Sequence, residues 1–345
     1  MAQKERPTTL GEMRAIIASF PAAARDAGAA AAAREAQLTK PAGALGRLEE
    51  INIWMATWQG KHPPSCVHPR TAVFAGNHGV AQQGVSAYPA EVTVQMVKNF
   101  VDGGAAVNQL CRAVDADLRV YEMALDTPTK DFTREPAMSD EECATAMAYG
   151  MMAVEPGIDL LAVGEMGIAN TTAAAALAAA IFGGPASAWV GPGTGVAGEA
   201  LARKTVVVEQ AVARHRAASD DGFELLRRLG GREFAAMVGA IMAARMARVP
   251  VLLDGYASCA AAAALHALDK SALDHCLVAH RSAEPGHRRL LDCLGKEPLF
   301  DLGMRLGEAS GATLAIAIVK GALACHSGMA TFAEAGVSGK DETPR

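Results

Sequence analysis

Short runs of β-branched and apolar residues alternate along this chain with longer segments of helical character. Six runs are predicted to be strands, at residues 71–75, 118–123, 158–163, 186–190, 249–253 and 276–279. Because parallel strands need long crossover connections, which are usually helices, this alternation predicts an α/β fold with a parallel six-stranded sheet flanked by helices. A chain of 345 residues is long enough for one large domain of this type, or for one large and one small domain.

Alanine-rich helical segments flank the predicted sheet region at both ends of the chain. Leu10, Met13, Ile16 and Phe20 recur at helical spacing, so residues 10–36 are predicted to form one or two helices. Residues 311–334 are predicted to form another helix. Residues 124–146 are the most polar stretch, which is typical of a solvated surface loop before a helix.

Charge and cysteine usage narrow the class of protein. The 32 Lys and Arg residues against 37 Asp and Glu give a net charge of −5, which argues against a nucleic-acid or membrane-surface partner. Every apolar run is broken before about 18 residues, so no transmembrane helix is expected. The start, MAQKERPTTLGEMRAI, carries charges where a signal peptide needs an apolar stretch. The seven cysteines form no CxxC pair, and we therefore expect a cytoplasmic protein with reduced thiols and no zinc site.

Small and polar residues follow most of the predicted strands. GNHGV follows the first strand, GEMGIANTT the third, GPGTG the fourth, DGYAS the fifth and HRSAEPGH the sixth. Because ligands of open parallel sheets bind outside the carboxyl ends of the strands, these five segments are expected to converge on one binding site.

The segments GEMGIANTT and GPGTG have the composition of anion-binding loops. Gly167 and Gly193 allow a close backbone approach, and a following helix N-terminus would present unpaired N–H groups to a phosphate. Ser282 could cap the helix after the sixth strand. Neither loop matches a Walker A or dinucleotide-binding pattern, and the alternative is that the glycines only permit tight turns.

Two charged residues beside these loops are candidates for contact with a ligand. Glu165 lies between two glycines, where it either caps the next helix or faces the ligand; Asn170 or Thr171 would be the more natural cap. Lys204 lies in a helical stretch after GPGTG, from which its ammonium group could reach a phosphate. A solvated helix lysine is the alternative.

Glu308 is the candidate for acid–base chemistry. It lies in DLGMRLGEASGA among small residues, and a carboxyl at the edge of an apolar pocket gains proton affinity, as a general base requires. A surface helix ion pair with Arg305 is the alternative. The chain has no HExxH, Cys/His cluster or GxSxG motif, so neither a metal site nor a serine nucleophile is expected. His78, His280 and His287 could bind a ligand or brace the loops.

Seven segments in order carry a resemblance to a known family. They are KPAGALGRLE, FAGNHGVAQQGVSAYPAEVTVQMVKNF, GEMGIANTTAAAA, GPGTG, PVLLDGYAS, HRSAEPGH and DLGMRLGEASGA, and the resemblance extends from residue 40 to about residue 338. In these segments the chain resembles the nicotinate-nucleotide:dimethylbenzimidazole phosphoribosyltransferases. Ala42 and Ala44 stand where this family usually has Pro and Ser, and Ala309 stands where it usually has Gly.

The resemblance implies a Rossmann-like large domain at residues 46–311 and a small helical domain built from residues 1–45 and 312–345. It also implies transfer of the 5-phosphoribosyl group from nicotinate mononucleotide to 5,6-dimethylbenzimidazole. The products would be α-ribazole 5′-phosphate and nicotinate, with inversion at the anomeric carbon, in the synthesis of the lower-ligand nucleotide of cobalamin. A homodimer with its sites near the subunit interface is implied, with no cofactor and no metal.

By the same resemblance, Glu308 is the general base that takes the ring N–H proton of the benzimidazole. Glu165 and Lys204 match positions beside the ribose and the phosphate pocket. The implied phosphate cradle consists of Gly167, Gly193, Thr194 and Ser282. Aromatic residues make up only 5% of the chain, so Tyr88 and Phe100 are the candidates for the base pocket, with core packing the alternative for Phe100.

Two other interpretations stay open. A nucleotide-binding regulatory module would keep the pocket without turnover, although a degenerate member would be expected to lose Glu308 or the glycine loops, which this chain keeps. A transferase with another acceptor base, such as adenine, another benzimidazole or a phenolic compound, is kept open by Ala309 beside the proposed base.

Overall fold

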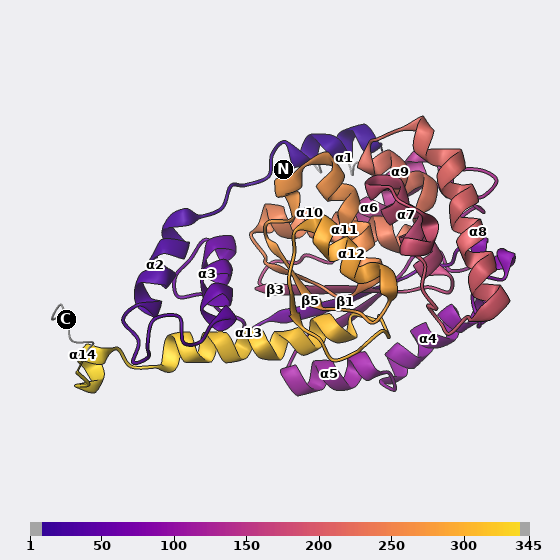
Figure 1. Cartoon of the computed structure of the whole chain (residues 1–345). Coiled ribbons are helices and arrows are strands. Elements are labelled where there is room, and N and C mark those ends of the chain that lie inside the picture. Colours follow the sequence, from indigo (N-terminus) through magenta and orange to yellow (C-terminus); the bar gives the residue numbers. More distant parts are fainter. Residues whose placement is uncertain (1–8, 339–345) are drawn as a thin grey trace.

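A computed structural model describes residues 9–338, which form a parallel sheet with helices on both faces (Figure 1). The six strands are β1 (Pro69–Ala75), β2 (Asp117–Glu122), β3 (Leu160–Met166), β4 (Val251–Leu253), β5 (Cys276–His280) and β6 (Pro298–Phe300). Neighbouring strands all pair in parallel in the order β2-β1-β3-β4-β5-β6, which confirms the predicted fold class. The predictions for residues 1–8, with most of the charged start, and for residues 339–345 lie outside the described residues.

One predicted strand is wrong, and one strand was not predicted. Residues 186–190 begin with the 3₁₀ helix η2 (Ala186–Ala188), and Trp189 behind it is fully buried, with its indole Nε1 donating to the Gly183 carbonyl. The apolar character of residues 186–190 therefore reflects the packing of Trp189 in the core and not a strand. The missed strand is β6, three residues at the sheet edge that begin with Pro298, where the lack of an N–H is tolerated. The GPGTG segment thus follows a 3₁₀ turn and not a strand.

Buried apolar side chains fill the space on both faces of the sheet. Strand β1 is buried along its whole length, as expected for a parallel strand covered by helices. One face is covered by α6 (Asp140–Met151), α7 (Asn170–Phe182), α9 (Gly222–Leu229), α10 (Arg232–Ala247), α11 (Tyr256–Leu268) and α12 (Pro285–Leu294). The other face is covered by α4 (Glu91–Asp102), α5 (Ala106–Val114) and α13 (Ser310–Gly328).

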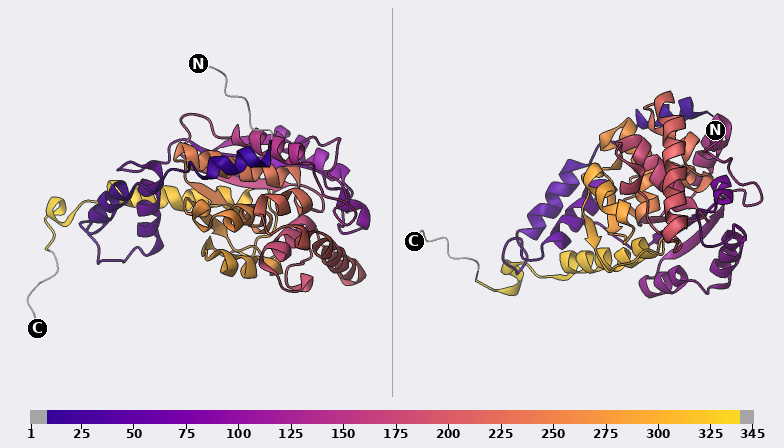
Figure 2. Two further views of the ribbon diagram at one scale, coloured as in Figure 1. Left: turned by 90° about the horizontal axis from the view of Figure 1, so that it is seen from above. Right: turned by 45° about the vertical axis from the view of Figure 1, so that its right-hand side comes forward.

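The terminal segments form four further helices, α1 (Leu10–Ile17), α2 (Arg25–Glu35), α3 (Arg47–Gln59) and α14 (Phe332–Ala335). Helix α1 buries Leu10 and Met13 in the main core, and Arg14 pairs with Asp221 at 2.7 Å. Helices α2 and α3 pack together and α3 packs on α13, so that they extend from one end of the sheet with α14 beyond them (Figures 1 and 2). The domain boundaries after residues 45 and 311 stay a prediction.

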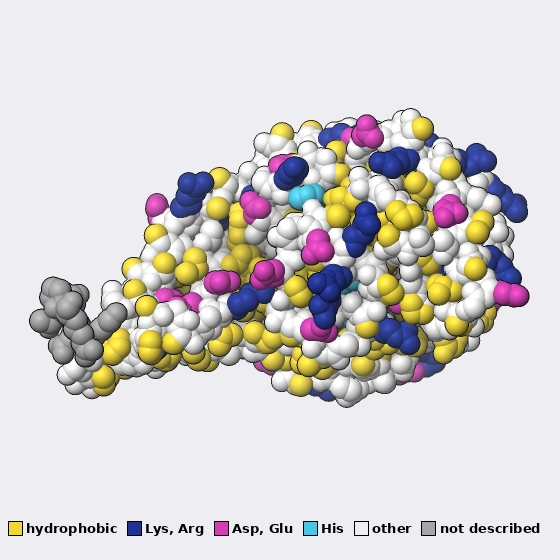
Figure 3. All heavy atoms as spheres, viewed as in Figure 1, with side chains coloured by type: hydrophobic (Ala, Val, Ile, Leu, Met, Phe, Trp, Pro, Cys, Tyr) yellow, Lys and Arg dark blue, Asp and Glu magenta, His cyan; other side chains and the backbone are white. Residues whose placement is uncertain are grey.

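Helix α13 is the one helix of residues 9–338 with the length and apolar composition to cross a membrane. Its side chains Ala312, Ala315, Ile316 and Val319 are fully buried in the core that also contains residues of β3, β4 and β5, which accounts for this composition. On the face shown in Figure 3, Lys and Arg side chains are interspersed with Asp and Glu and do not gather into a basic patch. All seven cysteines are free thiols.

Candidate active site

A cavity of about 490 Å³ lies at the carboxyl edge of the sheet. Its walls come from the segments that follow β1, β3, β4, β5 and β6, together with the GPGTG loop. Seven of the eight predicted site residues line this cavity, namely Tyr88, Glu165, Gly167, Gly193, Thr194, Ser282 and Glu308. Side chains far apart in the sequence therefore meet where ligands of open parallel sheets bind.

Lys204, the eighth predicted site residue, lies behind the wall. It is on α8 (Gly198–His215) and is 1% exposed, so the interpretation as a solvated helix lysine is wrong. Its Nζ donates to Thr171 Oγ1 at 2.8 Å and to the Gly191 carbonyl at 2.9 Å. Burial lowers the pKa of Lys204 to about 8, so the ammonium group stays mostly charged at pH 7. It holds the cavity wall through Thr171, which faces the cavity.

Glu308 occupies a sharp backbone corner just before α13. Both Glu308 and Ala309 adopt left-handed backbone, with φ of 60° and 57°, and the Glu308 N–H donates to the Glu165 carbonyl at 3.1 Å. Left-handed backbone costs a non-glycine residue about 1–2 kcal/mol, and such strain is frequent at active sites. Burial raises the pKa of the Glu308 carboxyl to about 7.

Arg305 does not form the surface helix pair with Glu308 that the spacing allowed. Residues 301–307 are not helical, and α13 begins only at Ser310, so the two side chains do not lie on one helix face. The Arg305 Nη1 instead donates to the Gly193 carbonyl at 2.8 Å, and Arg305 lines the cavity. This contact links the segment that carries Glu308 to the GPGTG loop.

Glu165 is a buried residue of β3 and does not cap α7. The cap position is taken by Ala169 in left-handed backbone, so the expectation of a cap at Asn170 or Thr171 is also wrong. The Asn170 side-chain amide donates to the Glu165 carboxylate. Burial, followed by the nearby carboxylates of Asp254, Glu233 and Glu308, raises the pKa of Glu165 well above its usual value.

Asp254 is a site residue that the sequence analysis did not single out. It follows β4 directly and is fully buried, and its Oδ1 accepts a hydrogen bond from the Ala312 N–H at 2.8 Å in the first turn of α13. Burial raises its pKa to about 7, although the backbone donors at the start of α13 favour the ionised form. In the sequence, the only signal for Asp254 is its position directly after a strand, at the start of DGYAS.

The glycines of the two predicted anion loops are required by close packing. A Cβ on Gly167 would come within 2.6 Å of the Gly76 carbonyl, and one on Gly193 within 2.5 Å of Thr171 Oγ1. The Gly193 N–H already donates to Glu284 Oε1 at 2.9 Å, so an acid occupies part of this loop. The GPGTG loop is therefore held by the carboxyl group of Glu284 and by two cations, Lys204 and Arg305.

Hydroxyl groups of the predicted cradle also bind protein groups. Thr194 Oγ1 accepts from the Ala87 N–H at 3.0 Å. The Ser282 N–H donates to His287 Nδ1 at 2.8 Å, while its Oγ accepts from the Glu284 N–H at 3.3 Å. The N-cap position of α12 is Glu284, two residues after Ser282, so the expectation that Ser282 caps this helix is wrong.

Comparison with known proteins agrees with this geometry. A family model described as phosphoribosyltransferase matches residues 20–337. The chain belongs to this family. It is 61% identical over 331 residues to the nicotinate-nucleotide–dimethylbenzimidazole phosphoribosyltransferase of Methylocella silvestris, covering 96% of this chain and 97% of the relative. The protein of the same name from Rhizobium meliloti is 58% identical over 330 residues, with 96% and 97% covered.

Solved structures of the family confirm the fold. The nicotinate-nucleotide-dimethylbenzimidazole phosphoribosyltransferase of Thermus thermophilus superposes with a TM-score of 0.85 at 40% identity. The match covers 91% of this chain and 99% of that chain. The family resemblance drawn from seven sequence segments is therefore confirmed.

Apolar side chains line the phosphoribosyltransferase cavity together with the acidic ones. They are Tyr88, Val92, Met96, Met166, Ile168 and Leu306. Tyr88 is 55% exposed at the cavity mouth. Phe100, the other aromatic candidate, is buried in the core beside Val73 and Val107 and is not among the cavity residues, which fits the packing alternative.

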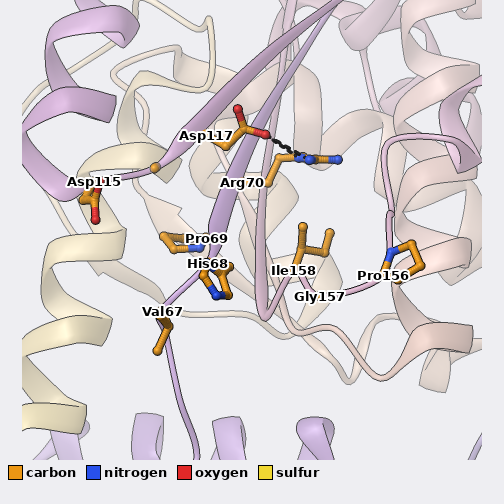
Figure 4. Close-up of a pocket in the computed structure, with 10 residues that line it drawn as sticks. Val67, His68, Pro69, Arg70, Asp115, Asp117, Pro156, Gly157 and Ile158 are labelled. Carbon is orange, nitrogen blue, oxygen red and sulfur yellow. Dashed lines mark hydrogen bonds and ion pairs between the residues drawn. The ribbon is translucent and has the colours of Figure 1, made fainter.

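A second hollow, of about 560 Å³, lies at the opposite edge of the phosphoribosyltransferase sheet (Figure 4). Its one buried charge, Arg70, is satisfied by protein groups, since it pairs with Asp117 and Glu155 at 2.9 Å and donates to the Ala153 carbonyl. His68 lies exposed on its rim. Within residues 9–338, no three His, Cys, Asp or Glu side chains are grouped so as to hold a metal ion.

Proposed function

We propose that this phosphoribosyltransferase transfers the 5-phosphoribosyl group from nicotinate mononucleotide to 5,6-dimethylbenzimidazole. The observation that carries the proposal is Glu308, a buried carboxyl with a pKa of about 7 that lines a cavity also lined by apolar side chains. A general base works best when its pKa lies near the working pH, and apolar side chains suit a flat neutral benzimidazole. The names of the relatives at 61% and 58% identity support the same activity.

In the proposed reaction, one ring nitrogen of the benzimidazole attacks the anomeric carbon of the nucleotide. The bond from that carbon to the pyridinium nitrogen breaks, and its electron pair neutralises the pyridinium ring, so that nicotinate leaves. Glu308 accepts the proton from the other benzimidazole nitrogen, and attack opposite the leaving group inverts the anomeric carbon. Because departure itself removes a positive charge, the positioning of two substrates and one base would supply the catalysis.

The charges around the cavity suggest how the nucleotide is oriented. Two cations, Lys204 and Arg305, contact the GPGTG loop. Their positive charge would favour the 5′-phosphate of the nucleotide at this loop. Glu165 and Glu308 line another part of the wall, with Asp254 buried behind it. When Glu308 is ionised, its carboxylate would favour the pyridinium ring of the substrate and the positive charge that develops on the ribose in the transition state.

The nature of the acceptor base is part of the proposal. Ala309, beside the proposed base, was the reason for considering other acceptor bases. It is fully buried and does not line the cavity, so its methyl group does not shape the acceptor pocket. We therefore favour 5,6-dimethylbenzimidazole, with adenine, other benzimidazoles and phenolic compounds as the comparison panel.

We also propose a cytoplasmic homodimer whose interface lies near the cavity mouth. Three exposed apolar side chains, Tyr88, Leu302 and Leu306, support this interface, because exposed apolar groups gathered near a site often mark a protein contact. Light scattering after size exclusion tests it: a mass of one chain at micromolar concentration would exclude a stable dimer, and a mass of two chains would support it.

The activity is tested by incubating the purified protein with nicotinate mononucleotide and each base, with and without EDTA, and measuring nicotinate release. We expect release with 5,6-dimethylbenzimidazole in both conditions. No release with any base would refute the transferase, and loss in EDTA would refute the metal-free reaction. Glu308→Ala is expected to lose most of the turnover, and full turnover in that variant would remove Glu308 from its role.

A further inference from the structure

Glu284 is a buried acid beside the loop where the 5′-phosphate is expected, and the proposed reaction gives it no part. It lies between β5 and α12, lines the cavity and is 4% exposed. A carboxylate at this place would repel a phosphate, and burial raises its pKa, so the ionised form is costly to keep here. An acid in such a position needs a contact that offsets these costs.

The Glu284 side chain turns away from its own helix. Glu284 holds the N-cap position of α12, where a side-chain oxygen usually accepts from the first N–H groups, but its side chain forms no capping hydrogen bond. Its Oε1 instead accepts from the Gly193 N–H at 2.9 Å, across 91 residues of sequence. The carboxyl group therefore supports the GPGTG loop and not α12.

The glycines of GPGTG allow the loop to approach this carboxyl group closely. A Cβ on Gly191 would come within 2.6 Å of Pro285 Cδ and would also clash with the Glu284 carboxyl. Gly193 adopts left-handed backbone, with φ of 52°, which glycine adopts without strain. A side chain at either position would disturb the contact between Glu284 and the loop.

Charged side chains hold the polar backbone atoms of the same stretch of loop. Lys204 donates to the Gly191 carbonyl and Arg305 to the Gly193 carbonyl, while Glu284 accepts from the Gly193 N–H. Lys204, the Gly193 N–H and Arg305 all favour the ionised form of Glu284, against the effect of burial. The loop is thus fixed by one acid and two cations before any nucleotide is bound.

We propose that Glu284 is a positioning residue, which holds the GPGTG loop in the conformation that receives the 5′-phosphate of nicotinate mononucleotide. This inference rests on the proposed function, because it takes that nucleotide as the substrate and places its phosphate at this loop. Glu284 acts through the Gly193 N–H and does not touch the substrate. A loop that is already ordered loses less conformational freedom when the phosphate binds, which strengthens binding.

The test separates the reach of the side chain from its charge. Glu284→Gln keeps an acceptor oxygen at the same distance without the charge, Glu284→Asp keeps the charge but is too short to reach Gly193, and Glu284→Met keeps neither. Glu297→Met, at a side chain that is 87% exposed, is the control. Each enzyme is assayed with 5,6-dimethylbenzimidazole and either nicotinate mononucleotide or nicotinate riboside, which lacks the phosphate.

We expect Glu284→Met and Glu284→Asp to raise KM for the mononucleotide about three- to tenfold, the effect of one lost hydrogen bond, with kcat within about twofold of wild type. Glu284→Gln should have a KM no higher than that of wild type, because it keeps the acceptor and removes a charge that repels phosphate. With the riboside, KM of every variant should agree with wild type within about twofold, because the phosphate is absent. Glu297→Met should match wild type with both substrates.

Three results would overturn the proposal. An equal rise in KM with mononucleotide and riboside would mean that Glu284 only supports the fold. The same rise in Glu284→Gln as in Glu284→Met would mean that the charge acts and not the hydrogen bond to Gly193. An unchanged KM in both Glu284→Met and Glu284→Asp would show that the loop keeps its conformation without this contact.

Failure of the proposed function is distinguishable from failure of this inference. If wild type releases no nicotinate, the proposed function fails, and calorimetric binding of the mononucleotide and the riboside to the same proteins still decides the role of Glu284. A wild type that binds neither compound would refute both. If Glu284→Met does not fold, Glu284→Asp carries the comparison with Glu284→Gln.

Discussion

Replacing Glu308 with glutamine is expected to stabilise the folded protein at neutral and alkaline pH. Burial raises the pKa of this carboxyl from an ordinary value of 4.5 to about 7. Between these values the folded state holds a proton that the unfolded chain has released, so the stability of the wild type falls as the pH rises through this window. Above pH 7 the ionised carboxylate costs about 3 kcal/mol of folding free energy, because each pKa unit corresponds to about 1.4 kcal/mol.

Glutamine has nearly the same shape but no charge, so the variant lacks this cost. Measured by urea unfolding, the free energy of unfolding of Glu308→Gln relative to wild type should rise by about 2 kcal/mol between pH 5.5 and pH 8. Glu297→Gln, at a carboxyl whose side chain is 87% exposed, is the control and should show a constant difference. A constant difference for Glu308→Gln would refute the argument that this carboxylate is ionised at a cost in stability.

The same variant should lose activity where it gains stability. A positioned general base contributes about 10²–10⁴-fold, so kcat should fall by that factor. In the wild type, kcat/KM should fall about tenfold per pH unit below pH 7, as Glu308 becomes protonated. Asp254 also has a pKa of about 7, and Asp254→Asn shows whether this acidic limb belongs to Glu308. If the fall of kcat/KM below pH 7 survives in Glu308→Gln and disappears in Asp254→Asn, the titrating carboxyl is that of Asp254 and not that of Glu308.

Three further substitutions test the supporting structure. Lys204→Met should raise KM for nicotinate mononucleotide about 10- to 100-fold in steady-state assays, because a charged donor that holds the anion loop is lost; an unchanged KM would contradict this. Gly164→Ala should lower the unfolding free energy by more than about 2 kcal/mol, since its Cβ would lie 2.1 Å from the Ala309 nitrogen. Glu233→Ala should cost about 1–3 kcal/mol in urea unfolding, because it leaves the buried His78 ring without the hydrogen-bond partner that it contacts at 2.5 Å. A change below about 0.5 kcal/mol would show that the pair is dispensable.

The pattern of the sequence predicts the sheet well where strands are long and buried. The two longest strands, β1 and β3, combine apolar runs with polar ends, and both were found. The segment that failed, residues 186–190, has the composition of a strand, but Pro185 and a short 3₁₀ turn precede the buried Trp189. Strand β6 was missed because three half-buried residues at an edge carry too little periodicity to be recognised.

The site residues that sequence reasoning missed are those whose importance depends on contacts across the fold. Asp254 stands in an ordinary strand-end position, and only the structure brings it against the start of α13. Glu284 resembles any helix-capping acid until its carboxylate is found on the Gly193 N–H. Lys204 was predicted as a site residue, but its burial was not, because that burial depends on the return of the GPGTG loop over α8.

The first glycine of GEMG has a role different from the one its motif suggests. Gly164 lies inside β3 and not in the loop after it, and a Cβ there would come within 2.4 Å of the Ala309 Cα. Its missing side chain lets the corner at Glu308 and Ala309 settle on the strand, where the Glu308 N–H reaches the Glu165 carbonyl. The two left-handed residues are thus held by contact with the central sheet, which offsets their backbone strain. A glycine whose motif is typical of a phosphate loop therefore positions the proposed base, and the buried methyl of Ala309 fits against it without reaching the substrate.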